Sequence, residues 1–453
     1  MKKNVDLLHE PILPALTRLA VPIMATSLVQ MAYNLTDMAW IGRLGAGAVT
    51  AVGTAGLYIW LSQGVVDVAR IGGQTKVAQA LGAGKKDLAG EYARGAIQTG
   101  IVLAIIFGLM SSLLAGPLIG IFKLSSSEII RESEKYLMIT GGLILFAFLN
   151  TVLTGILTAT GDSKTPFKAN VVGLVANIIL DPVLIFGVGP FPVMGVVGAA
   201  VATVTAQMIV TLIFVIAIRK EQMIFNKFHL FKKTPAHYIQ GIVSVGLPAG
   251  LRTILMAGVS MVLTRLITGW GDAAVAVQRV GGQIESISWM TAEGFGAAIN
   301  SFTGQNYGAG QINRVKQGYK ASVKVMTIWG LITTAMLVFL SVPIFRVFII
   351  EPDVVLAGSE YLIIIGYCQV FMCIEILTAG AFSGLGKTML PSVTSIILTG
   401  LRIPMAILFS ATALGLNGVW WALTVSSIMK GCFLFVMYLV TLKKLDTVKM
   451  NSK

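Results

Sequence analysis

Long apolar runs alternate along this chain with short polar segments. Twelve of these runs are close to the roughly 20 residues that a helix needs to cross the hydrocarbon core of a bilayer. They lie at 17–42, 48–70, 92–116, 136–159, 167–190, 195–218, 240–269, 273–297, 318–345, 361–383, 390–411 and 415–441. The polar segments between them contain Gly, Pro or Lys, which is typical of turns. The pattern therefore predicts an all-α membrane protein with twelve transmembrane helices.

The apolar pattern occurs twice in the chain. At an offset of 226 residues Pro22 aligns with Pro248, and further along an offset of 225 aligns Gly155 with Gly380. Duplicated bundles of this size are typical of transporters. Because each half holds six spans, an even number, both halves have the same orientation in the membrane. We therefore predict two six-helix lobes related by a pseudo-two-fold axis along the membrane normal.

The longest polar stretch divides the two halves and sets the predicted domain boundaries. We predict an N-terminal lobe at 1–218, a cytoplasmic linker at 219–237 and a C-terminal lobe at 238–453. The side of the membrane that holds both termini collects 22 of the 34 Lys and Arg residues, and the opposite side holds five. The positive-inside rule then places both termini in the cytoplasm. The expected location is the cell's inner membrane, as a multi-pass protein.

Composition agrees with a membrane protein and limits the expected partners. Charged residues make up 12% of the chain and hydrophobic residues 55%, whereas a soluble domain carries about 25% charged residues. The net charge of +14 is explained by orientation against anionic lipid, so no nucleic-acid partner is expected. The three cysteines lie in apolar spans without metal-ligand spacing and are expected to act as small hydrophobes. We expect a monomer in the lipid bilayer that handles small organic molecules.

Two carboxylates lie inside the apolar runs of the first half. Asp37 lies in the first span, with Asn34 three residues earlier, and Asp181 lies in the fifth span, with Asn177 four residues earlier. Residues at these spacings share a helix face, so each Asn is placed to hydrogen-bond its Asp. An ionised side chain costs roughly 2.5–3.5 kcal/mol at the bilayer centre, and such residues usually face a cavity or a partner. The two pairs indicate a site for protons or a small cation, the alternative being that each Asp bonds a neighbouring helix.

Other polar residues of the spans are weaker candidates. Thr203 in the sixth span has a hydroxyl oxygen to offer to the same site, although an isolated Thr usually bonds its own helix backbone. In the second half, Ser260 and Leu263 replace Asn34 and Asp37 and Arg402 replaces Asn177. The remaining carboxylates of the second half are candidates for substrate binding, coupling or a purely structural ion pair with an in-span Arg: Glu285, Glu293 and Glu375.

Pro22 lies in the first third of the first span and removes one backbone hydrogen bond there. It is either a bending point, at which protonation of Asp37 is converted into a helix movement, or a proline of the first helical turn. Pro248 has the equivalent place in the seventh span.

Several longer segments resemble the MATE (multidrug and toxic compound extrusion) family. They are Asn34-Leu-Thr-Asp37-Met-Ala-Trp-Ile-Gly-Arg-Leu-Gly45, Gly155-Ile-Leu-Thr-Ala-Thr-Gly-Asp-Ser-Lys-Thr-Pro166, Asn177-Ile-Ile-Leu-Asp181-Pro-Val-Leu-Ile-Phe and Gly195-Val-Val-Gly-Ala-Ala-Val-Ala-Thr203. The resemblance covers essentially the whole chain. It implies cation-coupled antiport that exports amphipathic, often cationic organic compounds by alternating access.

The resemblance also implies where coupling takes place. Asp37, Asn177, Asp181 and Thr203 match the N-lobe cation site of the DinF-type branch, and they would be the ligands if the cation is Na+. In the NorM-type branch important carboxylates lie in the C-terminal lobe, an option that Glu285 and Glu375 keep open. The coupling ion is expected to be H+ or Na+, and no other cofactor is expected.

Other classes of protein fit the sequence less well. A flippase for lipid-linked precursors, from the same wider superfamily, is the alternative function, although such proteins typically have fourteen spans and a cavity rich in Arg and Lys. An enzyme is not expected, because all three histidines lie outside the spans and no nucleophile–base pair is evident within them. An ATP-driven pump is excluded by the lack of a phosphate-binding loop.

Overall fold

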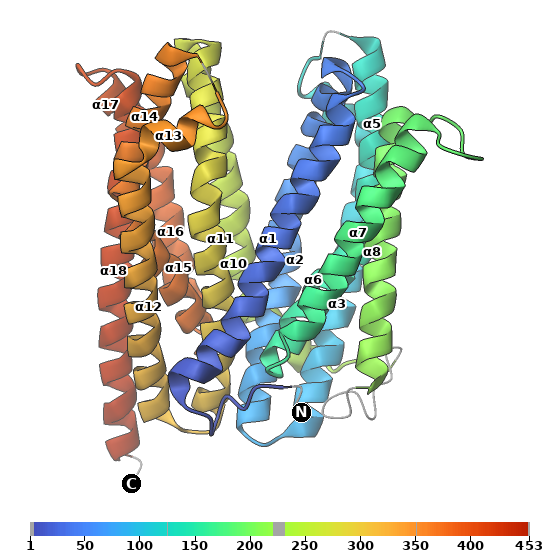
Figure 1. Ribbon diagram of the computed structural model, residues 1–453. Coiled ribbons are helices and arrows are strands. Elements are labelled where there is room, and N and C mark those ends of the chain that lie inside the picture. Colours follow the sequence, from blue (N-terminus) through green and yellow to red (C-terminus); the bar gives the residue numbers. More distant parts are fainter. Residues whose placement is uncertain (1–3, 125, 221–231, 350, 452–453) are drawn as a thin grey trace. The chain divides into compact units, whose positions relative to one another are not determined.

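The apolar runs form long helices in the computed structural model, which describes residues 4–124, 126–220, 232–349 and 351–451 (Figure 1). No strand occurs within these ranges. Nine helical segments among the described residues are long and apolar enough to cross a membrane. They are α1 (Ile12–Gly42), α2 (Ala46–Gly82), α3 (Lys86–Leu113), α7 (Lys164–Phe186), α8 (Gly195–Lys220), α10 (Ala236–Ile267), α12 (Ile312–Phe339), α16 with α17 (Met389–Gly400 and Arg402–Ser410) and α18 (Leu416–Asn451).

Two further spans are bent pairs of helices. The first pair is α5 (Ser127–Gly142) with α6 (Leu145–Ala159), bent by 43°, and the second is α14 (Pro352–Gly366) with α15 (Gln369–Gly384), bent by 51°. The remaining predicted span corresponds to α11 (Asp272–Gly308), which has 37 residues. Its lower hydropathy follows from charged residues such as Glu285 and Glu293. All twelve predicted runs thus coincide with helices or bent pairs, which confirms the all-α membrane fold. Three short helices complete the described chain: α4 (Ala115–Gly120), η1 (Thr268–Trp270) and α13 (Ser341–Arg346).

The chain forms two units whose boundaries cut through two helices. Unit 1 comprises Met1–Asp6 and Ala25–Gly250, and unit 2 comprises Leu7–Met24 and Leu251–Lys453. The division of α1 therefore falls two residues after Pro22, and that of α10 two residues after Pro248. The predicted lobes differ from these units by the first half of each of these two helices. Most of the predicted linker, residues 221–231, lies outside the described residues.

On α3 of unit 1 many of the buried residues are small, and several large apolar side chains face outward. On α3, alanines and glycines such as Ala93, Ala96 and Gly100 are buried, whereas Ile105 and Ile106 are exposed. This arrangement is expected in lipid, because association of helices there depends on close packing rather than on burial of apolar surface from water. The exposed faces accordingly carry large apolar side chains.

The first half of α10 belongs to unit 1 because its backbone approaches α2 closely. A Cβ atom at Gly246 would overlap the carbonyl oxygen of Val68, and one at Gly250 would overlap that of Gly64. Glycine on both helices is what permits this separation. Any larger side chain at Gly246 would push the two helices apart.

Unit 2 includes the segment that leads into α1, from Leu7 onward, which polar side chains hold against α11 and α12. Asn306 donates a hydrogen bond to the carbonyl oxygen of Leu7 at 3.0 Å. Arg314 donates to the same oxygen at 3.1 Å and to the carbonyl oxygen of Glu10 at 2.9 Å. Leu7 is fully buried. These contacts fix the chain just before α1 begins.

Candidate functional site

The predicted polar residues of the first half come together in unit 1. Asp37 is on α1, Asn177 and Asp181 are on α7, and Thr203 is on α8. Asn177 and Asp181 are completely buried. The amide nitrogen of Asn177 donates to Oδ1 of Asp181 at 3.0 Å, the contact expected of residues four apart on a helix. Three helices thus contribute oxygen atoms to one region of unit 1.

Each of these four residues has a buried oxygen without a hydrogen-bond partner in the described part of the chain. The oxygens are Oδ1 of Asp37, Oδ1 of Asn177, Oδ2 of Asp181 and Oγ1 of Thr203. A buried polar atom left without a partner costs about 1–3 kcal/mol, and more if it is charged. Most buried polar atoms in proteins are therefore paired, so four unpaired oxygens on neighbouring helices need an explanation. A cation that binds to these oxygens would provide one.

Electrostatic interactions connect the members of this cluster. Asp37 acts on Asp181, and both carboxylates act on the hydroxyl groups of Tyr33 and Tyr136. Tyr136 comes from α5, and Tyr33 lies one helical turn before Asp37 on α1. Thr203 is near both tyrosines. Two carboxylates that share a dry site repel each other, which favours the entry of a positive charge. Neither tyrosine was singled out from the sequence, because aromatic residues are common in apolar spans.

Asn34 does not take the predicted place beside Asp37. Its side chain is exposed, and its oxygen accepts a hydrogen bond from the amide of Gln30 at 3.4 Å. Helical side chains point toward the preceding turn, so Asn34 covers Gln30, while Asp37 points toward Tyr33. The predicted Asn34–Asp37 hydrogen bond is therefore wrong.

Pro22 lies inside α1, ten residues after the helix begins at Ile12, and therefore not in its first turn. Of the two interpretations drawn from the sequence, the proline of the first turn is excluded by this position. The backbone hydrogen bond that Pro22 omits lies within a continuous helix.

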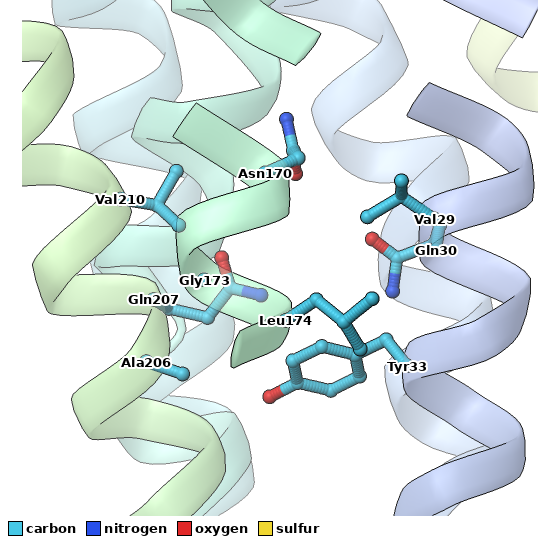
Figure 2. Close-up of a pocket in the computed structure, with 9 residues that line it drawn as sticks. All are labelled: Val29, Gln30, Tyr33, Asn170, Gly173, Leu174, Ala206, Gln207 and Val210. Carbon is cyan, nitrogen blue, oxygen red and sulfur yellow. The ribbon is translucent and has the colours of Figure 1, made fainter. Parts of the chain in front are cut away.

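A small pocket lies beside the oxygen cluster. It is lined by residues of α1, α7 and α8 and has a volume of about 10 Å³, close to the space of a single water molecule. Figure 2 shows Tyr33 and Gln30 entering from α1, opposite Asn170 on α7 and Gln207 on α8. The amide of Gln207 is fixed by Asn150 of α6, whose nitrogen donates to Oε1 of Gln207 at 2.8 Å. Unit 1 thus has neutral polar side chains next to its carboxylates.

The carboxylates of the second half have different surroundings. Glu285 of α11 accepts weak hydrogen bonds from Gln369 at 3.4 Å and Tyr361 at 3.5 Å. Glu293, also on α11, is exposed. Glu375 of α15 forms a buried salt bridge of 3.0 Å with Lys430. The partners predicted from the sequence are arginines, and Lys430 is not among them, although a lysine within an apolar span was the available signal.

Arg402 stands where the first half has Asn177, and it bonds hydroxyl groups instead of a carboxylate. Its Nε donates to Ser426 at 2.6 Å and its Nη2 to Ser427 at 2.9 Å. The oxygen cluster of unit 1 thus has no counterpart at this place in unit 2.

Comparison with known proteins places the chain in a family. The sequence model of the MatE family matches residues 22–183 and matches again at residues 248–408. The chain belongs to the MatE family. The two matches begin 226 residues apart, as the internal repeat predicts. Asp37, Asn177 and Asp181 all lie within the first match.

Relatives of this MatE protein cover nearly its whole length. It is 27% identical over 433 residues to a probable multidrug resistance protein NorM of Thermotoga maritima, an alignment that covers 94% of this chain and 91% of that protein. It is 24% identical over 436 residues to an FAD transporter of Shewanella oneidensis, covering 95% of both. Among solved structures, a MATE protein in complex with MaD3S superposes with a TM-score of 0.91 at 24% identity, covering 99% of this chain and all of that one. The predicted family and two-lobed helical fold are thereby confirmed, and MATE proteins are transporters rather than enzymes.

Proposed function

We propose that this MATE protein is an antiporter that exports amphipathic, often cationic organic compounds in exchange for H+ or Na+. The cation binds in unit 1 at Asp37, Asn177, Asp181 and Thr203. The observation that carries this proposal is the set of four buried oxygens without hydrogen-bond partners. A hard cation is bound in proteins by carboxylate, amide and hydroxyl oxygens of this kind. A proton on either carboxylate would serve the same purpose by turning an acceptor into a donor.

Exchange follows if cation binding and substrate binding favour different states of the protein. A ligand shifts a conformational equilibrium only by its difference in affinity for the two states. A cation neutralises the repulsion between Asp37 and Asp181, whereas a cationic substrate is attracted to the unneutralised pair. Loading one of the two ligands then promotes release of the other.

The relatives support the proposed substrate class. The protein of Thermotoga maritima and one of Bacillus subtilis, 28% identical to this chain, are both named as probable multidrug resistance proteins. Export of many compounds requires a surface that accommodates different shapes, and the 20 methionines of the chain are suited to that role because their side chains are adaptable.

A fluorescent organic cation in proteoliposomes tests the exchange directly. Efflux should accelerate when an inward gradient of either Na+ or H+ is imposed, and the two gradients are applied separately to identify the ion. The ionophore that collapses the active gradient should abolish the acceleration. Efflux that stays the same under both gradients would show that the protein is a uniporter or a flippase.

We also propose that both termini and the 219–237 segment lie in the cytoplasm, in the inner membrane of the cell. The unequal distribution of Lys and Arg supports this orientation. Reporter enzymes fused after residue 230 and after Lys453 should both show cytoplasmic activity. Periplasmic activity at either position would contradict the orientation, and a fusion in the segment between α1 and α2 serves as the opposite control.

A further inference from the structure

Unit 2 contains a buried lysine, Lys430, that forms a salt bridge with one carboxylate, that of Glu375. Lys430 of α18 is 1% exposed and Glu375 of α15 is 5% exposed. The ammonium lies 3.0 Å from Oε2 of Glu375, and the hydroxyl of Ser395 on α16 donates to Oε1 at 3.2 Å. The ammonium is thus held by one oxygen of the Glu375 carboxylate, and the other oxygen of that carboxylate accepts the hydrogen bond from Ser395.

The internal repeat identifies the same positions in unit 1. At the offset of 225, Asn150 corresponds to Glu375 and Asn170 corresponds to Ser395. Both asparagines belong to the polar region around the small pocket: Asn170 lines it, and Asn150 fixes the Gln207 that lines it. Glu375 and Ser395 therefore occupy the places of a neutral amide network.

The last helix of each half aligns at a shorter offset of 220. Gly195 and Gly415 both have positive φ angles, and three residues later Gly198 and Gly418 each approach the backbone of the preceding helix. Gly198 approaches Leu184, and Gly418 approaches Phe409, which is the position equivalent to Leu184 at the offset of 225.

This alignment places Lys430 at the position of Val210, another residue that lines the pocket of unit 1 (Figure 2). Val210 leaves the pocket of unit 1 partly empty. In unit 2, a longer and charged side chain extends from the same position. Its ammonium ends at the carboxylate that replaces Asn150.

We propose that Lys430 is a built-in cation that takes the place of a free monovalent cation at the carboxylate of Glu375, which Ser395 holds in position, so that no free cation binds in unit 2. This proposal does not depend on the oxygen cluster of Asp37, because Lys430 and Glu375 are not part of it. It assigns to Lys430 the role of confining cation exchange to one half of a duplicated transporter.

The charges around the pair agree with this role. Arg402 and Arg252 both act electrostatically on Lys430. Because both are positively charged, they lower the affinity of this region for a free cation. Arg402 is held by two hydroxyl groups and forms no salt bridge with a carboxylate among the described residues. Removing the charge of Lys430 leaves the carboxylate of Glu375 without its salt-bridge partner.

The test measures thermal unfolding of the full-length protein in detergent, in NaCl and in N-methylglucamine chloride of equal ionic strength. The background is the Asp37→Asn/Asp181→Asn variant, which removes the proposed site of unit 1 and should melt at the same temperature in both salts. Adding Lys430→Met should create a sodium-dependent increase of about 2–4 °C once sodium exceeds its Kd a few-fold. Adding Glu375→Gln as well should remove that increase.

The outcomes separate this proposal from the proposed function. A folded Lys430→Met variant that melts equally in both salts would overturn the role of Lys430. The same conclusion follows if Lys430→Met does not fold in either salt while Glu375→Gln/Lys430→Met folds. Folding of Lys430→Met only in sodium supports the proposal. Coupling at Asp37 is judged by the background variant alone, so either proposal can fail without the other.

Discussion

Asp37→Asn is expected to reduce gradient-driven export to the background of protein-free vesicles while the protein still inserts and folds. Asparagine preserves the shape of the side chain and its capacity for hydrogen bonding, but it neither carries a charge nor accepts a proton. The cluster would then keep only the carboxylate of Asp181 against the same amide and hydroxyl oxygens. Insertion should not suffer, because a neutral side chain costs less in the membrane than a carboxylate. Transport is measured per folded molecule in proteoliposomes, with and without a cation gradient.

Asp181→Asn is the matched comparison for this variant. It should weaken coupling with a smaller loss, because the partner Asn177 remains to hold the new amide in place. Wild-type export by Asp37→Asn under a cation gradient would show that coupling does not depend on unit 1. Glu285, Glu293 and Glu375 would then become the leading candidates.

Glu375→Gln is expected to lower the free energy of unfolding of unit 2 by about 3–5 kcal/mol, the usual cost of removing one partner from a buried salt bridge. Lys430 would be left in the interior with an amide oxygen and the hydroxyl of Ser395 in place of a carboxylate. The measurement is thermal or denaturant unfolding of the purified protein. Export per folded molecule should fall much less than in Asp37→Asn, because Glu375 is occupied by Lys430 and not by a transported ion.

The double variant Glu375→Gln/Lys430→Met is the control for this effect. It removes both charges together, and replacing a buried ion pair by neutral side chains is often harmless to stability. Recovery of most of the lost stability would attribute the effect to the unpaired ammonium. If Glu375→Gln alone is as stable as the wild type, the salt bridge contributes nothing and Lys430 has another partner.

The fold was predictable because the membrane imposes simple rules on sequence. Every backbone polar group must be satisfied inside the hydrocarbon, so an apolar run of sufficient length has to be a helix. The rule held even for α11, whose charged residues lower its hydropathy but whose length and place in the repeat still indicated a span. The repeat added the two-lobed arrangement, and the double match to the MatE family has the same offset.

The oxygen cluster was predictable for a different reason. Acidic residues are so costly in apolar spans that Asp37 and Asp181 stood out by themselves, and the helical period placed Asn177 beside Asp181. The same reasoning failed for Asn34, because residues three apart share a face only approximately and Tyr33 is nearer to the line of Asp37. The place of Tyr136 in the cluster could not be predicted either, since nothing in the sequence indicates which side of α5 faces α1.

The Lys430–Glu375 salt bridge and the division of α1 both depend on which helices are neighbours, and the sequence does not specify this. Pairing Lys430 with Glu375 requires knowing that α15 and α18 are neighbours and that both side chains lie at one depth. The repeat did not reveal the Lys430–Glu375 pair, since the offset that aligns the two halves changes from 225 to 220 before α18. The division of α1 after Pro22 depends on which helices its two halves pack against, and the helix itself is continuous in sequence.

The divided helices have a consequence for how such a protein arose. Cutting the chain at the 219–237 segment would yield two polypeptides, and neither would contain a whole unit: the first lacks the half of α10 that completes unit 1, and the second lacks the half of α1 that completes unit 2. The boundaries of the sequence repeat therefore differ from the boundaries of the structural units, which lie within α1 and α10. A single-copy ancestor built on this plan would have needed a second molecule to supply the missing half helix, and exchange of an identical segment between two copies is domain swapping. In a fused chain that exchange is permanent within one molecule and each half is free to change separately, as Asp37 and Asp181 in one half and Lys430 in the other illustrate.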